Sequence, residues 1–202
     1  MASFRSSERG GGKLSRRFSS AGSVAGSPFS QSQVLHLMKT EFARARRYGF
    51  PVSCMLIQVD RLDSLVDLHG VALRDTVREE FNKLVQEKTR GADHLGLASE
   101  DRHLVVMPHT PAEGAVLVGE RLREGFEDLE VRVGANVLAL HLSVGIASSD
   151  EQDTLFFDTL MAQAEAALQY SVSDGGNLVS LFNKDQIAGV GDGSDDPKSP
   201  DS

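Results

Sequence analysis

The chain is poor in cysteine and lacks tryptophan, since Cys54 is the one cysteine among its 202 residues. A single cysteine excludes an internal disulfide and a cysteine-based metal cluster. No apolar run approaches the roughly 18 residues of a membrane helix, and no apolar stretch follows the basic N-terminal residues as it would in a secretory signal. We therefore expect a cytoplasmic protein with no membrane partner.

Basic residues are also scarce relative to acidic ones, with 21 Lys and Arg against 29 Asp and Glu and a formal net charge of -8. This balance argues against a general nucleic-acid binder, whose surface must neutralise phosphates. The hydrophobic share of 40% and the charged share of 25% are typical of a globular protein. The length suits one domain with tails.

The charge is unevenly distributed along the chain. Residues 1–30 hold five basic residues against Glu8, a net charge of +4, and residues 184–202 have a net charge of -3. Both segments contain too little apolar surface to offset the entropy of ordering them. We expect a disordered basic N-terminal tail, a disordered acidic C-terminal tail, and one domain over residues 31–183 with a net charge of -9. Docking of a tail to an oppositely charged partner remains open.

Between the tails, hydrophobic periodicity predicts a mixture of helices and strands. Helices are expected over residues 31–47, 61–68, 72–88, 112–125 and 154–171, and strands over residues 52–59, 93–98, 103–108 and 178–182. Residues 129–148 are typical of a hairpin with one long strand from Val137 to Ala147, and Thr110 is the expected N-cap of the fourth helix. This order favours an α+β fold with a central, mostly antiparallel sheet flanked by helices, of the ferredoxin-like or nucleotidyl-cyclase type.

Several motifs follow one another in order over about residues 34–182. They are Arg44 to Pro51, Gln58 to Asp75, Leu104 to Pro108, Ser143 to Ala147, and Ala164 to Asn177. Together they resemble the GGDEF domain of the diguanylate cyclase family. The resemblance implies condensation of two GTP molecules into cyclic di-GMP by metal-assisted attack of a 3′-hydroxyl on an α-phosphate, with one GTP supplied by each of two facing domains.

That chemistry needs carboxylates to hold Mg²⁺ and a glycine turn that lets the backbone approach the nucleotide. The resemblance places Gln58 at the position of the first metal aspartate and Arg102 at the position of the catalytic and metal-binding glutamate. The signature itself is replaced by Ser99-Glu100-Asp101-Arg102-His103, so both glycines are missing.

Four further positions of the family pattern have changed. Asp63 and Val172 stand where the resemblance implies lysines, Gly176 where it implies an arginine, and Val66 where it implies the asparagine that reads guanine. Losing a metal carboxylate, the glycine turn and the phosphate cations together predicts a degenerate active site with no catalytic residue, no metal and no cofactor. The remaining acids are expected to have capping or solvated roles: Asp60, Asp67, Asp75 and Asp101. For Asp67 and Asp75 the alternative is to read a guanine edge.

One site of the family does match. Arg90-Gly91-Ala92-Asp93 lies five residues before Ser99, where the resemblance implies an inhibitory R-x-x-D site that binds stacked, intercalated dimers of cyclic di-GMP. A guanidinium can fork onto a guanine edge or a phosphate, and a carboxylate can accept hydrogen bonds from guanine N1–H and N2–H. We predict that Arg90 and Asp93 bind cyclic di-GMP. The alternative is a surface ion pair at the start of a strand, or a vestige of an active ancestor.

Three functions therefore stay open. The leading prediction is a catalytically inactive signalling receptor for cyclic di-GMP. The second is a protein-interaction module that has kept the fold and binds an unknown protein partner, and the third is an active diguanylate cyclase. The six histidines show no metal-ligand spacing, and Cys54, in the middle of an apolar strand, is expected to be buried and inert.

Overall fold

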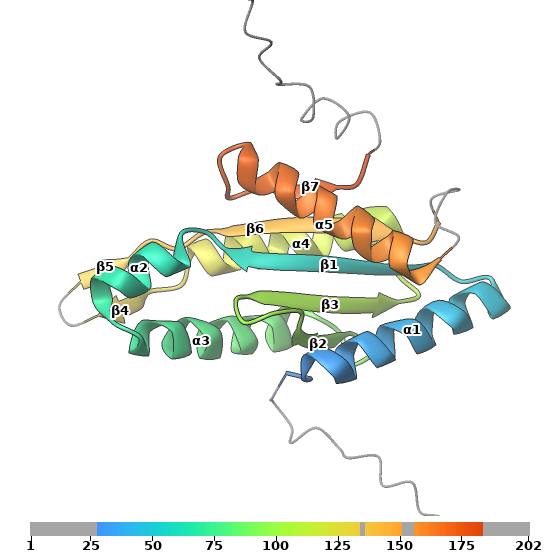
Figure 1. Ribbon diagram of the computed structural model, residues 1–202, viewed down its shortest axis with the longest axis horizontal. Coiled ribbons are helices and arrows are strands. Elements are labelled where there is room, and N and C mark those ends of the chain that lie inside the picture. Colours follow the sequence, from blue (N-terminus) through green and yellow to red (C-terminus); the bar gives the residue numbers. More distant parts are fainter. Residues whose placement is uncertain (1–27, 134–135, 151–155, 184–202) are drawn as a thin grey trace, which may run out of the picture.

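A five-stranded sheet forms the centre of the computed structural model, which describes residues 28–133, 136–150 and 156–183 (Figure 1). The strands run in the order β2 (His94–Leu97), β3 (Arg102–Pro108), β1 (Val52–Val59), β6 (Leu142–Ser148) and β7 (Val179–Leu181). Three of the four strand pairs are antiparallel, and β6 pairs with β7 in parallel. The predicted α+β fold with a mostly antiparallel sheet is confirmed. The two predicted tails lie almost entirely outside the described residues.

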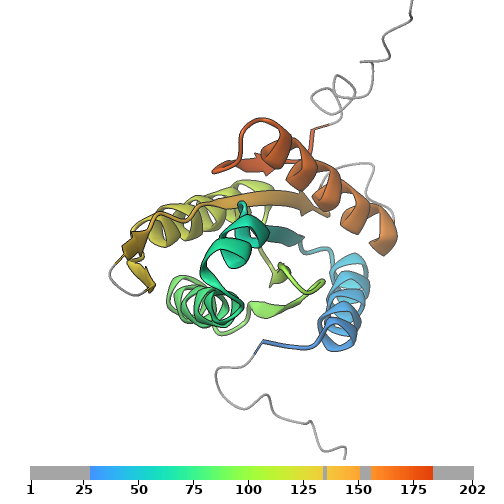
Figure 2. The same cartoon turned by 60° about the vertical axis from the view of Figure 1, so that its left-hand side comes forward.

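Helices cover both faces of this sheet (Figure 2). One face carries α1 (Gln31–Tyr48) and α5 (Phe157–Ser173), and the other carries α2 (Leu62–His69), α3 (Ala72–Lys88) and α4 (Ala112–Glu127). All five agree with the predicted helices to within a few residues. In the described part of the chain, no helix combines the length and the apolar character needed to cross a membrane.

The central position of β1 explains why its sequence is apolar without alternation. Met55 and Ile57 point into the core formed with α2, α3 and α4, whereas Cys54 and Leu56 point into the core formed with α1 and α5. A strand buried on both faces needs apolar side chains on both. Burial raises the pKa of the Cys54 thiol to about 12, so this thiol is inert as predicted.

The prediction of one long strand from Val137 to Ala147 is wrong. Instead β4 (Val131–Val133) and β5 (Asn136–Leu138) form a separate two-stranded sheet, and β6 starts only at Leu142. The chain leaves the small sheet at residues 139–141 and enters the large one, where the N–H of Asp60 donates to the carbonyl of His141 at 2.9 Å. Alternation of apolar residues continues through such a change of sheet, so it cannot reveal the break.

The N-cap of α4 also differs from the prediction. Pro111, not Thr110, occupies this position, and the Thr110 hydroxyl donates to the carbonyl of Pro108 at 3.2 Å. The carboxylate of Asp150 accepts a hydrogen bond from the N–H of Ala112 at 3.3 Å. A side chain 38 residues away therefore satisfies a free N–H at the start of the helix.

Two close approaches fix the helices on the sheet and thereby position the sites described below. A Cβ at Gly145 in β6 would lie 2.1 Å from the backbone nitrogen of Leu168, so only glycine lets α5 pack this closely. A Cβ at Gly96 in β2 would lie 2.4 Å from the Cβ of Val34 in α1. The backbone of Phe29, just before α1, pairs with the outer edge of β2 through two hydrogen bonds of 2.9 Å, to Leu95 and Leu97.

Candidate functional site

The predicted ligand-binding pair lies in the turn between α3 and β2. The carboxylate of Asp93 accepts a hydrogen bond from the backbone N–H of Arg90 at 2.8 Å, and the N–H of Asp93 donates to the carbonyl of Arg90 at 2.9 Å. Both hydrogen bonds use the backbone of Arg90, so the turn is closed without an ion pair between the Arg90 and Asp93 side chains. Arg90 is exposed, and its guanidinium has no ion-pair partner within the described residues.

A second group of charged residues lies at the other end of β2, around the turn that joins it to β3. Arg102 lies opposite Gln58 across the β1–β3 pair, and its Nε donates to the Gln58 amide oxygen at 3.1 Å. Its Nη1 donates to a carboxylate oxygen of Glu165, in α5, at 2.5 Å. The guanidinium is therefore held between β1 and α5, about one-third exposed at 36%.

The same turn is tied to α3 by Arg74. Its guanidinium forms ion pairs with Asp101 and, at 2.7 Å, with Asp63 at the start of α2. The hydrogen bond to Asp63 and, after it, the contact with Asp101 raise the pKa of Arg74. Arg78, one turn further along α3, donates to the carbonyl of Glu100 at 3.4 Å. The turn at residues 98–101 is thus fixed by arginines of this chain.

Beneath this turn lies a very small cavity. His103 is buried and packs against the ring of Phe81, with 4.5 Å between the ring centroids. Burial, and then the positive charge of Arg78, lowers the pKa of His103 to about 4, so its imidazole is neutral at pH 7. The cavity measures about 10 Å³, which is room for one water molecule at most. Among the described residues, the Nε2 of His103 and the Oδ1 of Asp101 have no hydrogen-bond partner.

Asp60, at the end of β1, holds a third turn. Its two carboxylate oxygens accept hydrogen bonds from the Ser143 hydroxyl at 2.6 Å and from the N–H of Asn177 at 2.8 Å. The turn at 175–177 has positive φ throughout, as its Gly-Gly-Asn sequence predicts. A Cβ at Gly176 would lie 2.7 Å from the Asp60 carboxylate. This acid therefore has a structural role.

These side chains do not suit a magnesium ion, which prefers several free oxygen ligands. Gln58 offers a neutral amide that is already bonded to Arg102, and the carboxylates of Asp60 and Asp101 already bind donors of this chain. Among the described residues, no group of three or more His, Cys, Asp or Glu side chains could hold a metal.

Sequence reasoning singled out Asp63, Asp101 and Arg102 but missed Arg74 and Glu165, the residues that pair with them. Glu165 lies 63 residues after Arg102, and Arg74 lies 27 residues before Asp101. No local spacing connects these pairs, because they meet only through the packing of α5 and α3 on the sheet. The predicted departures from the family pattern at Asp63 and Arg102 are the only signals in the sequence that point to partners of opposite charge.

The chain matches the family model described as "Diguanylate cyclase, GGDEF domain" over residues 29–178. It is 28% identical over 130 residues to Diguanylate cyclase A of Treponema denticola, covering 64% of this chain and 35% of that protein. The chain spans less than two-fifths of the length of the curated relatives it matches.

Solved GGDEF structures share the fold. The active GGEEF domain of a diguanylate cyclase from Vibrio cholerae superposes with a TM-score of 0.74 at 21% identity, covering 78% of this chain and 99% of that one. The GGDEF domain of DgcB from Caulobacter crescentus in complex with c-di-GMP gives a TM-score of 0.70 at 17% identity, covering 76% and 90%. With the match over residues 29–178, the chain belongs to the GGDEF domain family of diguanylate cyclases.

Proposed function

We propose that this GGDEF domain is catalytically inactive and acts as a cyclic di-GMP receptor through Arg90 and Asp93. The observation that carries the proposal is the contrast between two arginines. Arg102, at the altered signature, is bonded to Gln58 and Glu165, whereas the guanidinium of Arg90 is exposed and has no ion pair among the described residues. A cation without a counter-ion can bind a phosphate or a guanine edge without first breaking an internal contact.

The geometry of the turn supports this role. One oxygen of Asp93 accepts the N–H of Arg90, which fixes the two residues relative to each other before a ligand binds. The other oxygen accepts no hydrogen bond from the described residues and can accept a guanine N–H. Such preorganisation lowers the entropic cost of binding. The DgcB neighbour is a complex with c-di-GMP, which makes this ligand the natural one to test.

Charge makes a specific contact necessary. The ligand carries two phosphate charges, and the segment 31–183 has a net charge of -9, so non-specific attraction opposes binding. A charge-assisted contact from Arg90 is worth on the order of 1.5–3 kcal/mol. We therefore expect Arg90→Ala to weaken cyclic di-GMP binding at least about tenfold in titration calorimetry.

Two control variants distinguish the loss of a ligand contact from a general effect on the structure. Arg102→Ala removes another arginine, one already bonded within the chain, and we expect it to leave the affinity nearly unchanged. Asp93→Asn keeps an oxygen for the N–H of Arg90 but removes the negative charge, so it should weaken binding with the turn intact. Equal affinity of Arg90→Ala and the unaltered protein, or no binding at high micromolar ligand, would favour a protein-interaction module instead.

The names of the relatives favour a second candidate, an active diguanylate cyclase. Against it stand the neutral amide of Gln58 and the cation of Arg102, which Gln58 and Glu165 hold in place. Incubation with GTP and Mg²⁺ or Mn²⁺, followed by chromatography, tests this directly. We expect no protein-dependent cyclic di-GMP, and its formation by rigorously purified protein would contradict inactivity.

A further inference from the structure

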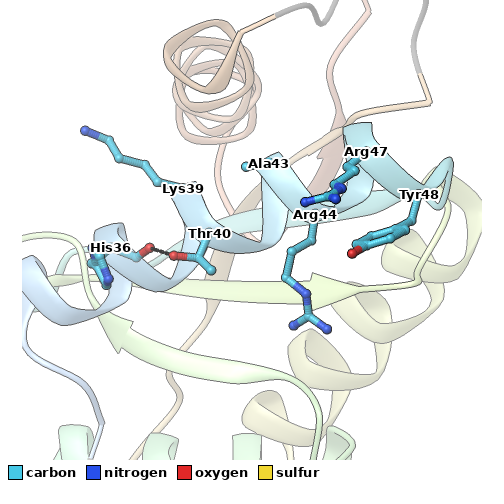
Figure 3. A pocket seen from close by; sticks show the side chains of 7 residues that line it. All are labelled: His36, Lys39, Thr40, Ala43, Arg44, Arg47 and Tyr48. Carbon is cyan, nitrogen blue, oxygen red and sulfur yellow. Dashed lines mark hydrogen bonds between the residues drawn. The ribbon is translucent and has the colours of Figure 1, made fainter. Parts of the chain in front are cut away.

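The outer face of α1 is a basic surface. Seven exposed residues line an open hollow of about 750 Å³ along this helix (Figure 3). They repeat at helical spacing: His36, Lys39, Thr40, Ala43, Arg44, Arg47 and Tyr48. In Figure 3 the Lys39 and Arg47 side chains extend from positions about two turns apart on the helix, and Arg44 leaves it on another side. We call these seven residues the α1 basic face.

Two cations of the α1 basic face form no ion pair with any of the described residues. Arg44 is paired with the buried carboxylate of Glu41 at 2.7 Å. The Lys39 ammonium lies 5.1 Å from the centroid of the Phe157 ring, and the Arg47 guanidinium lies 5.5 Å from that of Tyr48. Within residues 28–133, 136–150 and 156–183, neither Lys39 nor Arg47 forms an ion pair. These two charges are therefore free to bind carboxylates.

The other helices offer no comparable surface. By sequence, α1 has four cations against Glu41, a net charge of +3, whereas α3 is neutral and α2, α4 and α5 each have a net charge of -2. Among the helices of the described chain, α1 is the one with a net positive charge. An acidic segment is thus repelled by most of the surface and attracted by this face.

We propose that the acidic segment 184–202 of this same chain binds the α1 basic face. The segment holds five aspartates against two lysines, so its charge is complementary. It follows Phe182 and Asn183, and Phe182 packs against the same core cluster as α1 and α5. Nineteen residues can span about 60 Å, whereas the five strands of the sheet are about 19 Å across. The segment can therefore reach α1 from the end of β7.

The contact is intramolecular and electrostatic, which fixes its expected behaviour. Exposed ion pairs between a carboxylate and a basic side chain are individually weak and are screened by salt. A short tether holds the segment at an effective concentration in the millimolar range, which compensates for weak contacts. The segment should thus spend much of its time on α1 at low salt and leave it at about 1 M NaCl, where the Debye length is about 3 Å.

Paramagnetic relaxation in the full chain tests this. Cys54 is buried and its thiol has a raised pKa, so a spin label reacts selectively with Ser199→Cys. We expect the label to remove at least half of the amide signal intensity of the residues of the α1 basic face at low salt, and the signals to recover at about 1 M NaCl. Unchanged signals at low salt would overturn the proposal.

Charge variants identify the contacts. Lys39→Gln with Arg47→Gln should restore the α1 signals at low salt, whereas the matched pair Lys83→Gln with Lys88→Gln, on α3, should not. Changing Asp192, Asp195 and Asp196 to Asn should also restore them and leaves α1 itself intact. Broadening that survives both the α1 and the aspartate variants would overturn the proposal.

A mixed sample decides whether the contact lies within one chain. Spin-labelled protein without ¹⁵N is added to unlabelled ¹⁵N protein, so only contacts between molecules broaden the signals. We expect no broadening. Broadening of α1 signals in this sample would show that a second copy supplies the acidic segment and would overturn the intramolecular proposal.

Discussion

The two turns that flank β2 differ in how their charges are used. In the turn before β2, Arg90 keeps an exposed guanidinium without an ion pair among the described residues, and Asp93 binds only the backbone of Arg90. In the turn after β2, Asp101 is bound by Arg74, and Arg102 is bound by Gln58 and Glu165. The first turn has charged groups available to a ligand, and the second has used them within the chain.

The comparison shows that residue type alone does not decide what an arginine can do. An arginine already bonded to a carboxylate must lose that contact before it binds a phosphate, and the carboxylate then needs a new partner. The second turn is therefore a structural element that links β1, α3 and α5.

The largest change in the free energy of unfolding is expected from the protonation of His103, which lies beside the second turn. Its folded-state pKa of about 4 lies below the ordinary 6.5, so the unfolded chain binds the proton more tightly. The neutral His103 imidazole therefore makes its full contribution to the free energy of unfolding above pH 6.5, and this contribution is lost as the pH falls through 4. At pH 4 this costs about 3 kcal/mol of the free energy of unfolding relative to pH 7.

A matched variant isolates this contribution from the titration of carboxylates. His103→Leu removes the imidazole and leaves an apolar side chain against Phe81. In urea denaturation at pH 7 and pH 4, the unaltered protein should lose about 3 kcal/mol more than the variant. Equal losses in both proteins would show that His103 ionises freely in the folded state.

The next largest loss of stability is expected from a substitution in β2, the strand between the two turns. In Gly96→Ala the new Cβ would meet the Cβ of Val34 at 2.4 Å, so β2 and α1 must move apart. Overpacking of this kind costs about 1–3 kcal/mol in the free energy of unfolding, measurable by urea denaturation. Adding Val34→Ala should recover part of the loss, and no recovery would mean that Val34 does not cause it.

A smaller effect is expected from breaking the second turn. Arg74→Met leaves the half-buried Asp101 without its cation, at a cost of about 1–2 kcal/mol because the pair is partly exposed. Arg90→Ala in the first turn removes no ion pair of the described residues and should change the free energy of unfolding by less than about 0.5 kcal/mol. Thermal melts of both variants measure these losses of stability. Equal losses would show that the charged residues of the two turns do not differ in their contribution to the fold.

The sequence predicts most of the fold because each helix and the central strand carry their own signal. The largely apolar sequence of residues 52–59 predicts a strand buried on both faces, and the five-stranded sheet confirms it as β1. The hairpin over 129–148 was wrong in part, because the change of sheet at 139–141 depends on pairing between β6 and β1. Pairing between distant segments leaves no local pattern.

The candidate site is less predictable for the same reason. The pair Arg90 and Asp93 is local, so its spacing alone brings the residues together. The partners Arg74 and Glu165 come from α3 and α5, and only the packing of these helices on the sheet brings them to Asp101 and Arg102. Burial of His103 likewise follows from the pairing of β3 with β1 and β2, not from its neighbours in sequence.

The smallest effect is expected inside the first turn, at Gly91. A Cβ there would meet no atom within 4 Å, and the residue does not have a positive φ. Gly91→Ala should therefore be tolerated, and the less flexible unfolded chain should raise the free energy of unfolding by up to about 0.4–1 kcal/mol. Because Arg90 and Asp93 are unchanged, cyclic di-GMP affinity in calorimetry should match that of the unaltered protein. Gly176→Ala, with φ at +79° and Asp60 at 2.7 Å, is the control that should lose stability. If Gly91→Ala instead destabilises the protein as much as Gly176→Ala does, the turn before β2 is not the open, preorganised element on which its contrast with the second turn depends.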